Sequence, residues 1–136
     1  MLCVLWLVAC GPNEPDLSEL IGRYNVLVDG INGCANDLEL VEWMNGPLEI
    51  SSADDGLIFD FSDGMAFEGR VTDAGRFSYF GSGQLDERSY SSSGGGTVDG
   101  TKGSWNLNGE GTSTIQDDGS LNCSIVTSFT AVQIAE

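Results

Sequence analysis

The chain has 136 residues, the size of one small domain. Its 21 acidic residues against 5 basic ones give a net charge of −16, which disfavours a nucleic-acid partner because both would be negatively charged. Histidine is absent, which excludes Ser-His-Asp and Cys-His catalytic arrangements and removes the commonest metal ligand in proteins.

The first residues form an apolar segment that ends at a cysteine. Residues 2–8 are apolar and Ala9 is small, as in the last part of a secretory signal. The stretch Leu7-Val8-Ala9-Cys10 resembles the lipobox of bacterial lipoproteins, although no basic residue precedes it. The alternative interpretation is a buried N-terminal strand with two ordinary cysteines.

The lipobox resemblance implies a compartment and an anchor. It implies a signal peptide over residues 1–9, a lipid on Cys10 and a polar tether over residues 10–20, followed by one domain over residues 21–136. Gly11 stands where an aspartate would favour the inner membrane of a Gram-negative cell, so the resemblance implies the outer membrane. The lipid, rather than the acidic surface, would then hold the protein to the membrane.

The cysteine count agrees with this interpretation. Cys3 would leave with the signal and Cys10 would carry the lipid, which leaves Cys34 and Cys123 as an even pair in an oxidising compartment. We therefore predict a disulfide between Cys34 and Cys123. The alternative is two buried free thiols.

The elements expected next along the chain are short. Residues 16–21 are the clearest helix candidate, and residues 22–29 read as a first strand. Gly22-Arg23-Tyr24 resembles the opening of lipocalin-like and avidin-like barrels, with tyrosine in place of the usual tryptophan; the alternative is plain core. Residues 37–44 break strict alternation and fit either a bulged strand or a helical turn.

The remainder alternates between apolar and polar residues and is divided by glycine turns, which predicts about eight to ten antiparallel strands. The Gly-bearing pairs expected to form turns include Asp29-Gly30, Asp55-Gly56 and Asn108-Gly109, and residues 91–96 (SSSGGG) are expected to form a flexible loop or a widened hairpin end. Nearest-neighbour turns favour an all-β meander that closes into a small up-and-down β-barrel. The alternative is a β-sandwich.

The aromatic residues permit two interpretations of the barrel interior. Trp43, Phe67, Phe77 and Trp105 could line a pocket for a small apolar ligand. The same rings, together with the other aromatic residues, could instead fill the barrel. Small barrels are usually packed with side chains, so the filled core is the favoured alternative.

Catalytic and metal-binding signals are sparse. Asp54-Asp55 and Asp117-Asp118 are adjacent acidic pairs at glycine turns and are the places to look for calcium, although aspartate also serves turns and solubility. A Ser-Lys dyad would require Lys102, the single lysine, which stands in a glycine-rich turn. We expect no cofactor and no enzymatic activity.

These observations favour a monomeric, lipid-anchored envelope protein that acts as a binding or interaction module. Its partner would be a small apolar ligand or another envelope protein. The alternative is a structural envelope protein with a filled core and a hydrated acidic surface, and an enzyme is a more distant third class.

Overall fold

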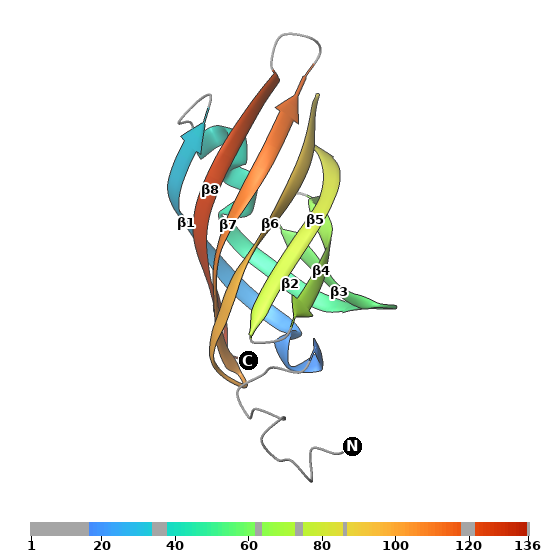
Figure 1. Ribbon diagram of the computed structural model, residues 1–136, viewed down its shortest axis with the longest axis vertical. Helices are drawn as coiled ribbons and strands as arrows, with labels where there is room; N and C mark the ends of the chain where they lie inside the picture. The colour runs from blue at the N-terminus through green and yellow to red at the C-terminus, as the bar shows by residue number, and fades with distance from the viewer. Residues whose placement is uncertain are drawn as a thin grey trace.

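The computed structural model of the chain describes residues 17–33, 38–61, 64–72, 75–85, 87–117 and 122–135. Eight antiparallel strands form one closed barrel, in which each strand pairs with the next along the chain and β8 pairs with β1 (Figure 1). The predicted up-and-down meander is therefore confirmed, and the sandwich alternative is excluded. The strands are β1 (Gly22–Gly33), β2 (Gly46–Ala53), β3 (Gly56–Phe61), β4 (Ala66–Thr72), β5 (Arg76–Leu85), β6 (Arg88–Thr101), β7 (Ser104–Gln116) and β8 (Asn122–Gln133).

The alternation expected from the sequence decides which side chains face the interior. In β8, for example, Cys123, Ile125, Thr127 and Phe129 are buried, whereas the residues between them are exposed or half-buried. Successive side chains on a strand point to opposite faces, so every second residue enters the core. Burial of these apolar side chains is the main stabilising contribution to the barrel.

The expectation of a loop at residues 91–96 is wrong, because these residues lie inside β6. Gly94 pairs with Tyr79 on one side and Gly111 on the other. A β-carbon on Gly94 would lie 2.8 Å from the Tyr79 ring and 2.7 Å from the Glu110 carbonyl oxygen, closer than real β-carbons approach. The glycine is needed here for space and not for a turn.

Two other predicted turns also lie within strands. Gly30 marks a register shift in the β1–β8 pairing, and β1 continues to Gly33 rather than ending at residue 29. Gly109 lies in the middle of β7, where a β-carbon would come within 2.8 Å of the rings of Phe77 and Phe129. A turn is confirmed at this place between β2 and β3, but its two connecting residues are Asp54 and Asp55, and Gly56 is the first residue of β3, paired with Ala53.

Two short 3₁₀ helices accompany the strands. The first, η2 (Leu17–Leu20), falls within the predicted helix, and η3 (Leu38–Met44) shows that residues 38–44 are helical rather than a bulged strand. Because Leu20 is fully buried, the folded unit includes residues that were expected to belong to the tether. Among the described residues, no helix has the length and apolar character needed to cross a membrane.

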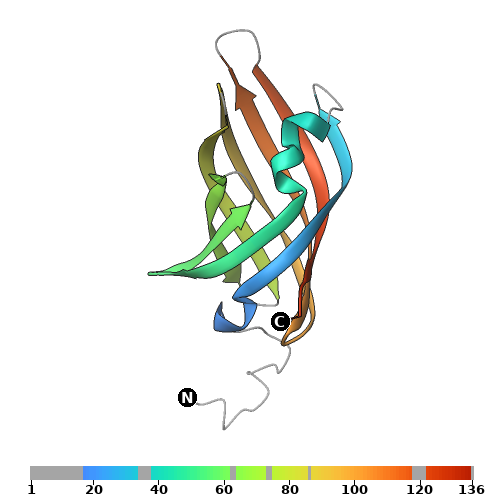
Figure 2. The same ribbon diagram turned by 180° about the vertical axis from the view of Figure 1, so that it is seen from behind.

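The two ends of the barrel differ. At the lower end β1 begins and β8 ends, and η2 lies beside them (Figure 1). Strands alternate in direction, so β2 and β3 are joined at the lower end, whereas β7 ends and β8 begins at the upper end. Strands β2–β4 are short, and η3 lies beside their upper ends (Figure 2). The side-chain amide of Asn45, which follows η3, accepts a 2.9 Å hydrogen bond from the Val28 amide and ties η3 to β1.

Candidate functional site

The upper part of the barrel interior is occupied by a cluster of aromatic rings. The Trp43 ring, supplied by η3, lies 5.5 Å from Phe61, 5.5 Å from Phe67 and 5.8 Å from Tyr90, measured between ring centroids. These spacings are those of rings in direct contact. Two of the predicted pocket residues, Trp43 and Phe67, therefore lie together, but they contact each other.

The other two predicted pocket residues lie elsewhere. Phe77 is stacked on Phe59 at 5.9 Å and meets Phe129 edge-on at 6.3 Å. Trp105 stands at the start of β7, at the lower end, and its indole nitrogen donates a 3.1 Å hydrogen bond to the carbonyl oxygen of Glu19. The four residues are thus spread along the interior and do not converge on one space.

Short helices supply buried side chains at both ends of the barrel. At the lower end, Leu20 is buried and its carbonyl oxygen accepts a 2.9 Å hydrogen bond from the Tyr24 hydroxyl. At the upper end, Trp43 and Met44 of η3 are buried. Both ends of the described interior are therefore occupied by the chain itself, which favours the filled core.

A small group of hydroxyls lies within this apolar interior. The Ser92 and Ser113 hydroxyls are 3.0 Å apart, and Thr127 is fully buried with no hydrogen-bond partner for its hydroxyl among the described residues. Burial raises the pKa of Tyr79 to about 12, and its hydroxyl is buried without a hydrogen-bond partner among the described residues. These groups stay neutral near pH 7 and provide no acid–base pair.

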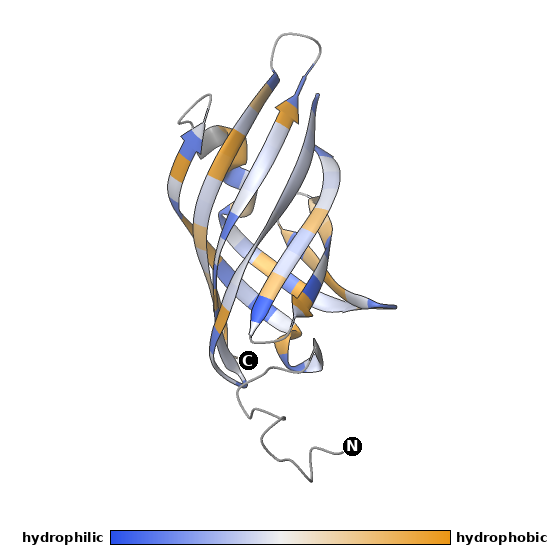
Figure 3. Cartoon of the chain, viewed as in Figure 1, coloured by the Kyte–Doolittle hydropathy of each residue, from blue (hydrophilic) through white to orange (hydrophobic). Residues whose placement is uncertain are grey.

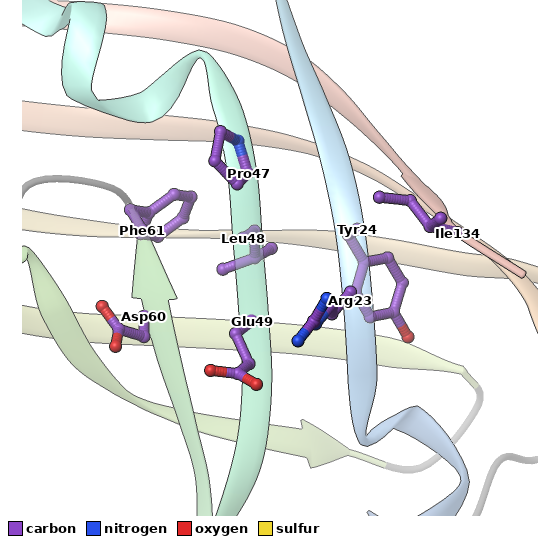
Figure 4. Close-up of a pocket in the computed structure, with 8 residues that line it drawn as sticks. All are labelled: Arg23, Tyr24, Pro47, Leu48, Glu49, Asp60, Phe61 and Ile134. Atoms are coloured by element: carbon purple, nitrogen blue, oxygen red, sulfur yellow. The ribbon is translucent and has the colours of Figure 1, made fainter. Parts of the chain in front are cut away.

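A charged hollow of about 430 Å³ lies over β1, β2 and β3 (Figure 4). Arg23 pairs in register with Glu49, and Glu49 pairs with Asp60, so one cation and two carboxylates form a row across three strands. Pro47 and Ile134 add apolar surface to the hollow. Sequence reasoning missed this row because the three residues come from separate parts of the chain and meet only through strand register.

A second surface, on the outside of β5–β8, is uncharged. It consists of three adjacent rows of outward-facing side chains, which we call the hydroxyl wall. The rows are Phe80–Ser93–Thr112–Val126, Ser82–Ser91–Thr114–Ser124 and Gln84–Ser89–Gln116–Asn122. Strands β6 and β7 are accordingly pale over much of their length in Figure 3, neither strongly hydrophobic nor strongly hydrophilic.

A hollow of about 440 Å³ lies over the middle of the hydroxyl wall, with Phe80, Ser91 and Thr112 among its lining residues. The Phe80 ring is 50% exposed, unlike every aromatic residue in the core. The serines of β6 were expected to form a loop, so the sequence alone did not indicate that they stand side by side with hydroxyl residues of β5, β7 and β8.

The calcium candidates do not come together. Asp54 and Asp55 stand at the β2–β3 turn, at the lower end, where they border a hollow of about 280 Å³ with Glu68 and Arg70. Asp117 follows β7 at the upper end, and Asp118 lies outside the described residues. Within the described ranges, no three Cys, Asp or Glu side chains form a group that could hold a metal ion.

The cysteine predictions fall largely outside the described residues, as Cys3, Cys10 and Cys34 all do. Cys123 is buried in β8 and is not a free thiol. Gly33, the residue before Cys34, pairs with Ile125, two residues from Cys123. This register is compatible with the predicted bridge, which stays a prediction.

Comparison with known proteins did not show a family for the chain. No protein-family model matches the chain, and neither a curated protein nor a solved structure is detectably similar to it.

Proposed function

We propose that this chain is a bacterial envelope lipoprotein, anchored by a lipid on Cys10, whose barrel is a binding module that meets its partner on the outer wall. The binding role of the outer surface is supported by one observation: side chains occupy the interior of the barrel. Trp43 contacts three other rings near one end, and Leu20 is buried at the other.

This occupation argues against a carrier of an apolar ligand. Ligand pockets usually have volumes of about 300–1,000 Å³ and enclose most of their ligand. Three hollows of that size among the described residues, of about 430, 440 and 450 Å³, lie on the outside of the barrel. A partner would therefore meet polar side chains on the surface.

The anchor would also orient the barrel. Residues 10–16 separate the proposed lipid from η2 and can span at most about 25 Å when fully extended. Because η2 lies at the lower end, the lower end would stay near the membrane. The hydroxyl wall lies on the side of the barrel and extends to the upper ends of β5–β8, so its upper row would lie farthest from the membrane.

Metabolic labelling with palmitate tests the anchor. We expect label on the wild-type protein and on Cys3→Ser, which keeps the lipobox cysteine, and no label on Cys10→Ser. Globomycin, which inhibits cleavage of lipoprotein signals, should make the unprocessed precursor accumulate. Equal labelling of Cys10→Ser and the wild type would refute the proposal.

A structural role is the second candidate, because a net charge of −16 on a small barrel would supply a hydrated acidic surface. The two candidates differ in one measurable property. A purely structural protein would show no saturable binding that depends on a particular surface residue. We expect no enzymatic activity, and Lys102, the candidate for a Ser-Lys dyad, is exposed in the β6–β7 turn.

A further inference from the structure

We propose that the hydroxyl wall binds an uncharged polysaccharide. This inference rests on the proposed function, because it names the partner of the outer wall. In the middle row of the wall, four hydroxyl residues stand side by side on four consecutive strands: Ser82, Ser91, Thr114 and Ser124. Neighbouring strands are about 4.7–4.9 Å apart, so the row presents hydroxyls over about 14–15 Å.

Each of these hydroxyls can donate one hydrogen bond and accept two. Ser82, Ser91 and Ser124 are exposed, and Thr114 is half-buried. The hydroxyls of Thr114 and Ser124 are 3.3 Å apart, and this contact leaves further hydrogen-bonding capacity on both oxygens. The row can therefore exchange hydrogen bonds with a ligand that itself carries many hydroxyls.

The charge of the wall points to an uncharged ligand. The chain carries 21 acidic residues, yet none of the twelve wall positions is Asp, Glu, Lys or Arg. The acidic residues nearest to the wall stand at its border: Glu68 of β4 pairs with Phe80, and Glu110 stands in the adjoining row, where it pairs with Gly95 and Ser128. A cationic ligand would find more attraction elsewhere on this surface, and an anionic polymer would be repelled by the net charge.

The wall also differs from a typical protein-binding surface. The cores of protein–protein interfaces are rich in apolar and aromatic side chains. On this wall Phe80 is the one strongly exposed large apolar residue, and Val126 is half-buried. A single ring among hydroxyls suits a sugar, whose ring has an apolar face and a hydroxyl rim, better than a second protein.

Phe80 is placed to provide the stacking surface. It lines the hollow of about 440 Å³ together with Ser82, Ser91 and Ser93 of the neighbouring positions. An exposed phenylalanine contributes less to folding than a buried one, since its ring remains in water. Its position beside three hydroxyls gives the ring a role in contacting the apolar face of a sugar.

Affinity electrophoresis of the full-length protein in detergent tests this assignment. The gels would contain one of three soluble uncharged polysaccharides (dextran, laminarin or galactomannan) or, for contrast, anionic polygalacturonate. We expect at least one uncharged polymer to retard the wild type and polygalacturonate to have no effect. Failure of all three uncharged polymers to retard it would overturn the proposal, as would retardation by polygalacturonate alone.

Two matched substitutions locate the binding surface. Phe80→Ala should weaken binding at least tenfold and lower the melting temperature only slightly, because half of the residue's surface is already exposed to water. Leu27→Ala removes a side chain that is 60% exposed on β1, away from the wall, and should leave binding unchanged. Equal effects of the two substitutions would overturn the assignment to this wall.

Two further readouts separate the remaining outcomes. A concentration-dependent dimer that disappears in Phe80→Ala would show that the wall binds a second copy of the chain and would contradict the proposal. Palmitate labelling of the same preparation reports on the anchor independently. If the wild-type protein carries the label but binds no polysaccharide, the polysaccharide proposal is contradicted and the proposed lipid anchor is not.

Discussion

The hydroxyl end of Tyr79 occupies the space that a β-carbon on Gly111 would fill, two strands away from Tyr79. The tyrosine ring reaches this position across Gly94, which pairs in register with both residues. On the inner face of β5, β6 and β7, the large Tyr79 ring therefore lies over Gly94 and Gly111, which have no side chains. Packing of this kind leaves little room for additional atoms.

Substitution of Gly111 tests this packing. We expect Gly111→Ala to lower the free energy of unfolding by about 1–3 kcal/mol, because the added methyl group must displace Tyr79. Gly30→Ala is the matched control, since its β-carbon would approach no atom closer than 3.4 Å. Urea denaturation measures both. Equal stability of Gly111→Ala and the wild type would contradict the close contact.

Removal of Trp43 tests whether the interior is filled. Trp43→Ala should cost about 3–5 kcal/mol and leave a cavity among Phe61, Phe67 and Tyr90. We expect the variant to bind an apolar fluorescent dye such as anilinonaphthalene sulfonate and the wild type not to bind it. Equal dye binding by the wild-type barrel would indicate that its interior is already open.

Helix η2 should become less stable when the hydrogen bond from Tyr24 to Leu20 is removed. Tyr24→Phe removes the 2.9 Å bond to the Leu20 carbonyl oxygen, and we expect a loss of about 0.5–1.5 kcal/mol. Hydrogen exchange of the amides in η2 should become faster, whereas the amides of η3 at the other end should keep their rates. Uniformly faster exchange would indicate global destabilisation instead of local release of η2.

Stability should fall in alkaline solution because of the buried tyrosines. Burial raises the pKa of Tyr79 from 10.0 to about 12, and it also raises the pKa of Tyr24. Above pH 10 the unfolded chain releases protons that the folded barrel retains, so stability decreases as the pH rises toward 12. Each tyrosine contributes about 1.4 kcal/mol per pH unit in this window, and none of this loss occurs below pH 9.

Urea denaturation at pH 8, 10 and 11 measures this dependence. The decrease should be smaller in Tyr79→Phe, which lacks one of the two ionisable groups. If the variant and the wild type lose the same amount of stability between pH 10 and 11, the assignment of the effect to Tyr79 is wrong.

The predicted disulfide between Cys34 and Cys123 can be tested through stability and through thiol alkylation. A Cys34–Cys123 bridge would close a loop of about 90 residues and contribute roughly 4–5 kcal/mol in the chain-entropy model. Cys34→Ser, Cys123→Ser and the double variant should then lose similar amounts of stability, because each removes the same bond. Mass spectrometry without reductant should find neither thiol alkylated, and alkylation of both thiols would disprove the bridge.

The sequence by itself determined the class of fold and the composition of the core. Alternation in segments such as residues 57–61 and 122–130 predicted half-buried antiparallel strands, and the aromatic residues of those segments are buried. This could be predicted because the two-residue period of a strand is a local property. The same local reasoning failed at Gly94 and Gly109, where glycines that resemble turn residues make room for rings supplied by other strands.

Only the tertiary structure decided which surface residues stand together. The row Arg23–Glu49–Asp60 and the row Ser82–Ser91–Thr114–Ser124 each join residues from several strands. Their alignment depends on strand register around a closed barrel, where a shift of one residue would reverse the face of every side chain. Alternation within one strand shows which residues face outward, but it contains no information about their neighbours on the next strand.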